Sequence, residues 1–287
     1  MDLSKLHILA FVPFLFCISL VHGWGIDGHL IICKIAQPRL STKARHAVSE
    51  LLPAYANNDL SQVCSWADRV KFRYHWSSPL HYIDTPDKLC TYDYKRDCKD
   101  EDGIQDRCVA GAINNYTTQL LRYGNNNDSS ASQYNLTEAL LFLSHFIGDI
   151  HQPLHVGFTS DRGGNTVDVR WYRRKEVLHH VWDNNIIETS EQRFYDSNIE
   201  ELIDTLQHNL TTVWSNQTKA WEACSETACP DKYASEGIKA ACEWAYKGVD
   251  EGSVLEDDYF LSRDPIVNLR LAQGGVRLAA TLNRIFG

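Results

Sequence analysis

Residues 136–150 read LTEALLFLSHFIGDI, a stretch that is apolar around almost its whole circumference, and Pro153 follows it. A helix without a polar face is buried on all sides, and proline cannot continue the helical hydrogen bonds. The stretch therefore predicts a central buried helix. Within it, His145 and Asp149 are four residues apart, which places an imidazole and a carboxylate on one face, one turn from each other.

The rest of the chain indicates helices more than strands. Apolar residues recur at helical spacing over residues 41–52, 59–72, 196–221, 232–249 and 265–286. Residues 165–172 alternate and are followed by the polar break 173–175, which predicts a short β-hairpin. The polar tract 124–133 predicts an exposed loop. With no internal repeat and no proline-rich linker, the sequence predicts one compact, mainly α domain over residues 24–287.

The first 23 residues have the pattern of a secretory signal peptide. Lys5 precedes an apolar run over residues 6–20, and Val21 and Gly23 occupy the −3 and −1 positions of a cleavage site. The run is shorter than the roughly 20 residues that span a bilayer, so we expect no membrane anchor. Cleavage after Gly23 would make Trp24 the first residue of the mature chain and leave a free α-amino group on it.

The cysteine count fits an oxidising compartment. Cleavage removes Cys17 and leaves an even number, which predicts four disulfides. Short separation favours the pairs Cys98–Cys108 and Cys224–Cys229, and the pairing of the rest stays open. The eight cysteines are Cys33, Cys64, Cys90, Cys98, Cys108, Cys224, Cys229 and Cys242.

Secretion also gives meaning to the Asn-x-Ser/Thr triplets, because these are acceptors for N-linked glycans. The triplets begin at Asn115, Asn127, Asn135, Asn209 and Asn216. We expect glycans on several of them and an extracellular or vacuolar location.

The composition restricts the class of function. Hydrophobic residues make up 44% of the chain, which excludes disorder as its main state. The formal net charge is −9, from 28 Lys and Arg against 37 Asp and Glu. That balance argues against a protein that binds nucleic acid through a wide basic face. If the chain acts on phosphates, another source of positive charge must be present.

Histidine and aspartate recur in apolar surroundings. A carboxylate such as Asp149 in a buried helix needs a cation or strong donors, and a second pair, His179 and Asp183, has the same spacing as His145 and Asp149. His155 follows the central helix, and His29, Asp68 and His81 lie in other apolar stretches. Imidazole nitrogen combined with carboxylate oxygen suits zinc. Each of these residues alone is more simply a hydrogen-bonded core group, but the whole set favours a metal centre.

The other histidines do not share this pattern. His151 and His180 are adjacent to candidate ligands but out of phase with them, and His46, His75 and His208 have no apolar context. We predict that these five are not ligands.

These motifs occur together in one known family. The runs are Trp24-Gly25-x-x-Gly28-His29, Trp66-Ala67-Asp68, Pro79-Leu80-His81-Tyr82-Ile83-Asp84, residues 145–155 (HFIGDIHQPLH), Gly163-Gly164-Asn165 and His179-x-x-Trp182-Asp183. In this order they resemble the zinc-dependent single-strand-specific nucleases of fungi and the bifunctional nucleases of plants. The resemblance covers the whole expected mature chain.

The resemblance implies a helical fold that holds three zinc ions in a cleft. One zinc would be bound by Asp68, His81, His145 and Asp149. A second would be bound by His29, Asp149 and the amine and carbonyl of Trp24, with Asp149 as the bridge. The third would be bound by His155, His179 and Asp183. Three Zn²⁺ exceed the charge of three carboxylates, so the site would attract a phosphodiester on an acidic protein.

The same resemblance implies the reaction and the substrate contacts. The enzyme would hydrolyse single-stranded DNA and RNA to products with 5′-phosphates, and 3′-nucleotides as well, with Asp68 and Asp149 at the reacting centre. Lys71 and Asn165 would contact phosphate, Tyr82 would stack on the base, and Asp84 would accept hydrogen bonds from its edge. The alternatives are a solvated Lys71 and a core Tyr82. We expect a monomer.

Two other functions stay open at this point. A zinc-dependent phospholipase C also begins at Trp and uses His and Asp ligands, but a choline site favours an aromatic cage. A secreted metal-binding protein without catalysis is the second alternative. The sequence does not decide between RNA and DNA or whether the segment after Gln273 is trimmed.

Overall fold

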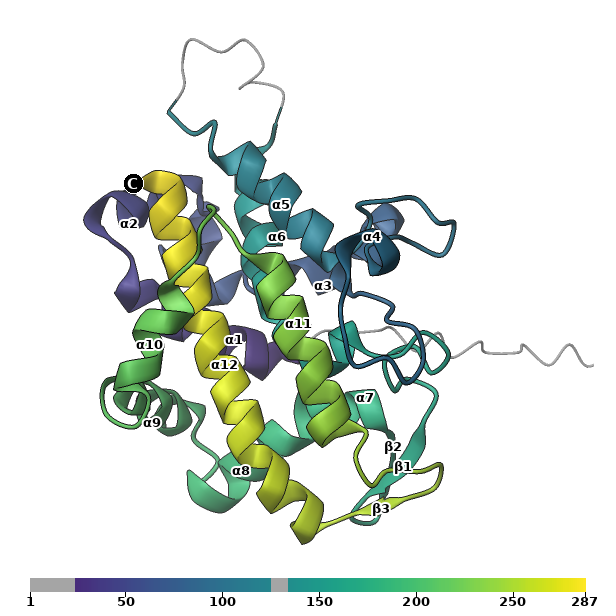
Figure 1. Cartoon of the computed structure of the whole chain (residues 1–287). Helices are drawn as coiled ribbons and strands as arrows, with labels where there is room; N and C mark the ends of the chain where they lie inside the picture. The colour runs from purple at the N-terminus through teal and green to yellow at the C-terminus, as the bar shows by residue number, and fades with distance from the viewer. Residues whose placement is uncertain (1–23, 125–133) are drawn as a thin grey trace, which may run out of the picture.

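The computed structural model describes residues 24–124 and 134–287. The predicted signal peptide, residues 1–23, lies outside the described residues. So do the sequon at Asn127 and the predicted loop 124–133, apart from Gly124. The rest of the chain forms helices around one core, with a small sheet at one end (Figure 1). The predicted mainly α fold is confirmed.

Twelve α-helices and three short strands make up the described chain. The helices are α1 (Ile26–Ala36), α2 (Thr42–Leu51), α3 (Trp66–Val70), α4 (Tyr94–Asp97), α5 (Val109–Leu120), α6 (Leu136–Asp149), α7 (Leu178–His180), α8 (Ile186–Phe194), α9 (Ile199–Thr211), α10 (Ser215–Glu222), α11 (Pro230–Ala240) and α12 (Asp257–Phe286). The strands are β1 (Asp168–Trp171), β2 (Arg174–Val177) and β3 (Val254–Leu255). None of the described helices combines the length and the apolar character needed to cross a membrane.

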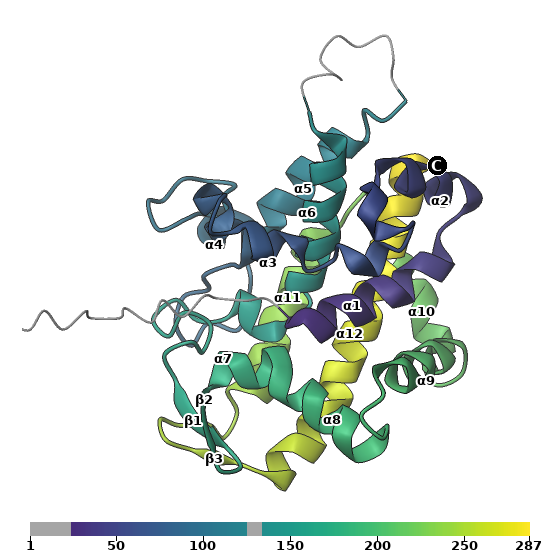
Figure 2. The ribbon, with the colours of Figure 1, turned by 180° about the vertical axis from the view of Figure 1, so that it is seen from behind.

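The predicted central helix is α6. Its first turn is capped by Asn135, whose side chain accepts a hydrogen bond from the backbone N–H of Glu138 (3.2 Å). Every residue from Ala139 to Asp149 is buried. Helices α1, α3, α5 and α12 pack around α6 (Figures 1 and 2), so the side chains of its last turn face other protein elements on all sides.

The first and last helices of the described chain pack against each other. Two consecutive glycines in α12 make the close approach possible. A Cβ atom added to Gly275 would lie 2.5 Å from Cγ2 of Ile35, and one added to Gly274 would lie 3.1 Å from Cδ1 of Ile32. Alanine at position 275 would therefore push α1, which carries His29, away from α12.

The predicted helix over residues 59–72 is wrong in its middle. The structure has a 3-10 turn at Leu60–Gln62 and then the short helix α3. In a continuous helix the carbonyl of Cys64 would accept from the N–H of residue 68. Here it lies 2.7 Å from Nδ1 of His145, so the backbone leaves the helical path to hold a side chain of α6.

Three other predicted helices have different bounds. Residues 196–221 form α9 and α10, because the hydroxyls of Thr211 and Thr212 bond to the carbonyl of His208 and end α9 (2.8 and 2.9 Å). The helix predicted over residues 232–249 begins earlier, at Pro230, as α11, and continues into a π-helical turn over Ala241–Ala245. Helix α12 begins eight residues before Pro265, because Phe260, fully buried, anchors its first turns. Helices α1, α4, α5, α7 and α8 are not predicted.

The predicted hairpin is present, but its second strand begins earlier. Strands β1 and β2 pair antiparallel, with Trp171 opposite Arg174. Tyr172 has a positive φ of 55°, which closes a two-residue turn. Arg174 and Lys175 therefore belong to β2 and not to a break. Strand β3 adds to β1 in parallel, with Arg170 opposite Val254.

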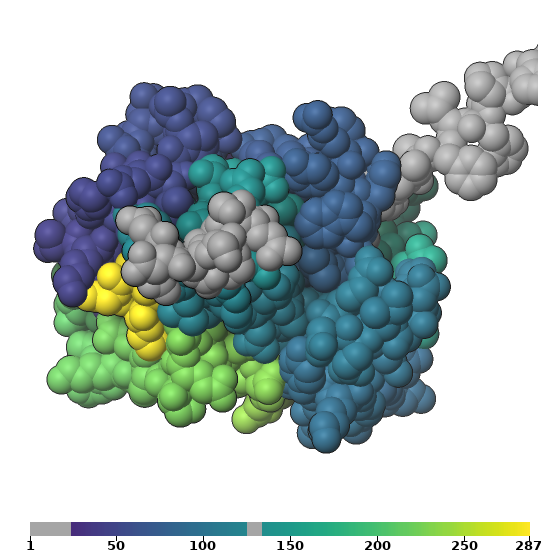
Figure 3. Space-filling model, turned by 90° about the horizontal axis from the view of Figure 1, so that it is seen from above, coloured from purple at the N-terminus to yellow at the C-terminus, as the bar shows by residue number. Residues whose placement is uncertain are grey.

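Disulfides tie distant segments to this frame. The predicted pairs Cys98–Cys108 and Cys224–Cys229 are confirmed, and the structure adds Cys33–Cys64 and Cys90–Cys242. At the other end of the chain, Asn283 of α12 bonds to the backbone of Ser41 and Arg39 (2.7 and 3.0 Å). The view from above shows the yellow end of the chain beside the purple N-terminal segments (Figure 3).

Candidate metal centre

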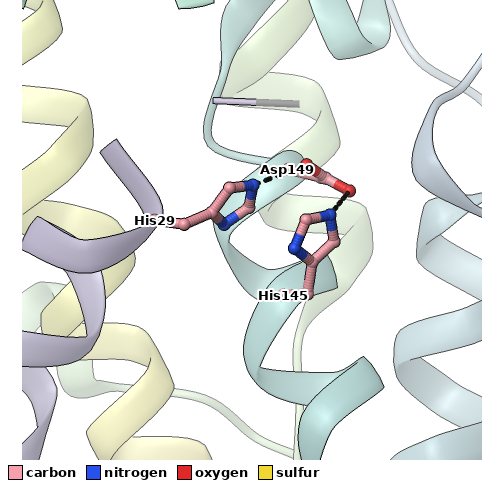
Figure 4. Close-up of side chains that lie close together, drawn as sticks. All are labelled: His29, His145 and Asp149. Atoms are coloured by element: carbon pink, nitrogen blue, oxygen red, sulfur yellow. Dashed lines mark ion pairs between the residues drawn. The ribbon is translucent and has the colours of Figure 1, made fainter. Parts of the chain in front are cut away.

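The last two turns of α6 contribute the first residues of the site, His145 and Asp149. His145 Nε2 lies 3.1 Å from Asp149 Oδ2, and His29 Nε2, from α1, lies 3.3 Å from Asp149 Oδ1. The two imidazole rings stack with centroids 3.9 Å apart. Figure 4 shows the carboxylate of Asp149 at the edge of both rings, with an ion pair to a nitrogen of each. All three side chains are fully buried, so one carboxylate faces two imidazoles out of contact with solvent.

A second group shares His145 with the first. It adds Asp68 from α3 and His81 from the end of the 3-10 turn His75–His81. His145 Nε2 is 3.5 Å from Asp68 Oδ1, and His81 Nδ1 is 2.8 Å from Asp149 Oδ2. The two groups share His145, and His81 of the second contacts Asp149 of the first, so they overlap around these two residues of α6.

A third group consists of His155, His179 and Asp183. The Nε2 atoms of the two imidazoles are 3.2 Å apart, and His179 Nε2 is 3.4 Å from Asp183 Oδ2. His155 Nδ1 lies 3.7 Å from Asp149 Oδ1, which places this group next to the first. In each of the three groups the potential ligand atoms lie within 4.8 Å of one another.

Backbone carbonyls fix the orientation of three imidazoles. The Nδ1 atoms of His145, His155 and His179 lie 2.7, 2.6 and 2.6 Å from the carbonyl oxygens of Cys64, His81 and Gly163. A carbonyl accepts only from N–H, so these bonds place a proton on Nδ1 and turn Nε2 toward the group.

The unsatisfied atoms of the site fit a divalent cation. Nε2 of His29 and Oδ1 of Asp149 are buried and make no hydrogen bond among the described residues. A buried donor or acceptor without a partner costs roughly 1–3 kcal/mol, and a buried carboxylate needs a counter-charge. The donors are imidazole nitrogens and carboxylate oxygens, which is a set that zinc prefers over calcium or magnesium.

The electrostatics of the groups follow from the buried charges. Burial alone would raise the pKa of Asp149, but the charges of His145 and His155 hold it well below its usual range. Burial lowers the pKa of His29 to about 4. His145 is the exception, because Asp149 and Asp68 overcome the effect of burial and raise its pKa to about 10. The two carboxylates thus stabilise a positive charge between them, at the overlap of the first two groups.

Asp183 is the third buried carboxyl of the site. Burial raises its pKa well above the usual range, and the charges of Asp68 and Asp149 add to the effect. A cation between His155, His179 and Asp183 would reverse this shift.

Trp24 lies just before the N-terminus of α1. Its side chain is fully buried and packs against Gly28, where an added Cβ would meet Cβ of Trp24 at 2.8 Å. The N–H of the next residue, Gly25, donates to the carbonyl of Asp183 (2.9 Å). The predicted first residue of the mature chain is therefore held in place beside the third group.

The predicted substrate residues lie around two hollows. Tyr82 and Asp84 line one of about 770 Å³, here called the Tyr82 hollow, together with Lys99, Arg162 and His179. Tyr82 is half-buried, so it is not a core aromatic. Asn165 and His179 line a second hollow, described below. His179 is thus a wall residue of both.

Lys71 is not a solvated helix residue. It is 7% exposed, and its Nζ lies 2.8 Å from Oδ1 of Asp68. The ammonium group therefore lies directly at the second group, where it holds the carboxylate of Asp68 in place.

The predicted non-ligands stay outside the three groups. Nδ1 of His151 lies 2.6 Å from the carbonyl of Ile147, and its Nε2 faces Arg277. The other four are exposed: His46, His75, His180 and His208. Of the described sequons, Asn115, Asn135 and Asn216 are exposed and Asn209 is partly buried.

Gln152 lies at the candidate site and is not among the residues that the sequence predicts. Its Nε2 donates to Oδ1 of Asp183 (2.6 Å), and its Oε1 accepts from the N–H of Leu154 (2.6 Å). It is fully buried. The amide therefore joins the turn after α6 to the third group. Its position between Asp149 and His155 in the sequence is the only signal that could have indicated this.

Replacement of this partner should weaken the third group. We expect Gln152→Ala to lower metal affinity by about 10–100-fold, the usual cost of losing a group that orients a ligand. Chelator competition on the purified protein measures the affinity. The exposed Gln217 of α10 gives the matched control, Gln217→Ala, which should leave the affinity unchanged. Equal affinities in the two variants would contradict the role of Gln152.

A family model described as S1/P1 nuclease matches residues 24–287. The chain belongs to the S1/P1 nuclease family. It is therefore a nuclease, an enzyme that hydrolyses phosphodiester bonds.

Known relatives align with this chain over most of their length. The chain is 69% identical to Endonuclease 2 of Arabidopsis thaliana over 93% of this chain and 92% of the relative. It is 57% identical to Endonuclease 4 of the same plant, with the same shares of 93% and 92%. It is 30% identical to Nuclease S1 of Aspergillus oryzae over 93% of each chain.

Proposed function

We propose that this protein is a secreted, zinc-dependent endonuclease that cuts single-stranded DNA and RNA, leaves 5′-phosphates and also removes phosphate from 3′-nucleotides. The observation that carries the proposal is the position of the three His/Asp groups. They adjoin one another, and His179 of the third group lines both hollows. A phosphate held at the groups would have room for a nucleotide on either side.

Three zinc ions per chain fit the donors. Asp68, His81, His145 and Asp149 would hold the first, His29, Asp149 and the amine and carbonyl of Trp24 the second, and His155, His179 and Asp183 the third. The ions bring six positive charges against the three ligating carboxylates. The surplus supplies the attraction for phosphate that a chain of net charge −9 lacks.

Bound zinc neutralises the phosphate and acts as a Lewis acid toward phosphate and water. The chain's own residues orient the reaction. Lys71 holds the carboxylate of Asp68 at 2.8 Å, so that Asp68 can orient the attacking water. Asn165, on the wall next to His179, would donate to a phosphate oxygen. In the structure its Nδ2 donates to the carbonyl of Arg162 (2.8 Å).

Preference for single strands would follow from Tyr82. A ring on the wall of the Tyr82 hollow can stack only on a base that has left its own stack, and stacking discriminates little between bases. Asp84, on the same wall, would accept hydrogen bonds from the edge of the base.

The pKa of Asp84 makes this contact dependent on pH. Burial, with the charge of Glu101, raises the pKa to about 6. The group is a carboxylate above that pH and a neutral acid below it, so we expect KM for a 3′-nucleotide to rise as pH falls through about 6. Asp84→Asn should raise KM roughly tenfold at pH 7, the loss of one hydrogen bond to a charged group.

The control for this prediction is Asp87→Asn, since Asp87 is exposed and is not among the residues that line the Tyr82 hollow. The ratio of KM between Asp84→Asn and the parent enzyme should shrink below pH 6. A ratio that is constant between pH 5 and 8 would show that Asp84 is not the titrating contact.

The Tyr82 hollow does not favour phospholipase C. Tyr82 is the one aromatic residue among the described residues on its wall, and Lys99, Arg96 and Arg162 line it as well. The carboxylates of Asp84, Asp100 and Glu101 balance these cations, but choline requires an aromatic cage, which a single ring does not form. The decisive assay compares single-stranded DNA, RNA, a 3′-nucleotide and phosphatidylcholine, each with and without chelator. Release of phosphocholine without nucleotide would overturn the proposal, and metal binding without any turnover would favour a non-catalytic protein.

The predicted signal peptide and the four disulfides support passage through the secretory pathway to the vacuole or the exterior. We propose a monomer that retains all of α12. Residues 270–282 of this helix are buried, so trimming after Gln273 would remove part of the core.

A further inference from the structure

A hollow of about 790 Å³ lies beside the third His/Asp group, on the side away from the predicted base contacts. Its wall comes from the start of α1 (Gly25, Ile26), from the hairpin (Arg170, Lys175) and from Asn165, His179 and Asp183, among others. We call it the hairpin hollow. The predicted substrate contacts of the family motif account only for Asn165, at its edge.

Two cations face each other across the hairpin strands. Arg170 of β1 is the direct partner of Lys175 of β2, so both side chains project from the same face of the sheet. Both are exposed. Like charges directly opposite each other destabilise a strand pair. An anion bound between the two side chains would remove this repulsion, so the pair suits the wall of a hollow that binds a phosphate.

The carboxylates of Asp168 and Glu176 line the same hollow, but neither forms an ion pair with Arg170 or Lys175. Arg174 lies 3.7 Å from Glu188, and Glu176 lies 3.8 Å from His180. Asp168, the remaining acidic residue of the hairpin, is on the same face as Arg170. Within the described part of the chain, the side chains of Arg170 and Lys175 form neither an ion pair nor a hydrogen bond, with Asp168 or with any other residue.

The position of His179 relates the two hollows. It lines both the Tyr82 hollow and the hairpin hollow, so the third group lies between them. A strand whose scissile phosphate is at the His/Asp groups would leave one nucleotide in each hollow. In a 3′-nucleotide, the base that Tyr82 and Asp84 would bind belongs to the nucleoside that keeps the 3′-oxygen. The hairpin hollow is then left for the nucleotide that keeps the 5′-phosphate.

We propose that the hairpin hollow binds the nucleotide on the 3′ side of the cleaved bond and that Arg170 and Lys175 together bind the next phosphate of the strand. Ile26, 69% exposed at the wall, offers an apolar surface to the sugar or base between them. This assignment rests on the proposed nuclease activity. It would allow an acidic protein to bind a polynucleotide more tightly than a single nucleotide.

The double variant Arg170→Ser/Lys175→Ser tests the assignment. Its matched control is Lys43→Ser/Arg45→Ser on α2, which removes the same two charges from exposed positions at the opposite end of the molecule (Figures 1 and 2). The substrates are a 3′-nucleotide, a dinucleoside monophosphate and a trinucleotide. Only the trinucleotide carries a phosphate beyond the scissile one on the 3′ side.

We expect the hairpin variant to lose about tenfold in kcat/KM on the trinucleotide, as for one charged contact at an exposed site, and to match the parent on the other two substrates. The slope of log kcat/KM against log salt should fall by about 0.7, the value for one phosphate contact in a single strand. Replacing that phosphate by an uncharged methylphosphonate should lower the parent enzyme to the level of the variant and leave the variant unchanged.

Product affinity gives a readout independent of turnover. The parent should bind the 5′-phosphorylated dinucleotide more tightly than the 5′-mononucleotide, and the hairpin variant should bind both equally. Thermal unfolding should show the hairpin variant at least as stable as the parent, since a repulsion is removed.

Three results would overturn the assignment: an equal loss on the dinucleoside monophosphate, an equal loss in the control variant, or a methylphosphonate effect that persists in the hairpin variant. Failure of the nuclease proposal itself is distinct, because the parent enzyme would then cleave none of the three substrates.

Discussion

Asp149→Asn should abolish most of the activity and remove two of the three metal ions. The side chain keeps its volume and loses its charge at the point where the first two His/Asp groups overlap, with His29 at 3.3 Å, His81 at 2.8 Å and His145 at 3.1 Å. An amide neither neutralises a cation nor bridges two of them. We expect the loss in kcat/KM to exceed about 100-fold, which is the upper end of the cost of losing a supporting group alone.

Metal analysis of the purified mature protein separates this effect from unfolding. The parent should hold three zinc ions and Asp149→Asn about one, at the third group, which does not contain Asp149. The exposed Asp204 of α9 provides the control, Asp204→Asn, with full metal content and activity. Asp149→Asn with three ions and parent activity would refute the bridging role.

One residue added before Trp24 should remove the second zinc and most of the activity. An α-amino group has an ordinary pKa of about 7.7–8.0, so it loses its proton near neutral pH and can then bind a metal, unlike lysine. An added residue turns this amine into an amide, which is a poor ligand. The fully buried side chain of Trp24 and the 2.9 Å bond from Gly25 to Asp183 hold the chain start in place, so the added residue cannot supply its own amine at the same point.

The experiment uses two leaders that a specific protease removes, one leaving Trp24 first and one leaving Gly before Trp24. We expect three zinc ions and full activity in the first product, and two ions and a small residual activity in the second. Removal of the extra glycine by an aminopeptidase, followed by zinc, should restore both. Full activity with three bound ions in the extended protein would show that cleavage and metal assembly are not coupled.

The sequence predicts the parts of this structure that depend on local pattern. The all-apolar stretch at 136–150 requires a buried helix, and the four-residue spacing of His145 and Asp149 requires a shared face. Eight of the nine predicted ligands come together as side chains in the three groups. Their binding of zinc stays a prediction, as does the role of Trp24.

What the sequence does not predict depends on contacts between distant segments. The helix expected over residues 59–72 is interrupted because the carbonyl of Cys64 bonds to His145, which is 81 residues away in the sequence. The pairs Cys33–Cys64 and Cys90–Cys242 join segments 31 and 152 residues apart, and separation gives no signal for either. Gln152 has an ordinary polar side chain whose role exists only because the fold brings Asp183 within 2.6 Å of it.

The glycine pair at 274–275 has a consequence for biosynthesis. Helix α1 carries His29 and begins two residues after Trp24, near the start of the described chain. It packs on α12, the last helix of the described chain. Removal of the predicted leader would therefore not by itself complete the metal centre, since α1 can take its place only once α12 is present. We therefore expect the proposed activity to arise only after the whole of α12 has been made.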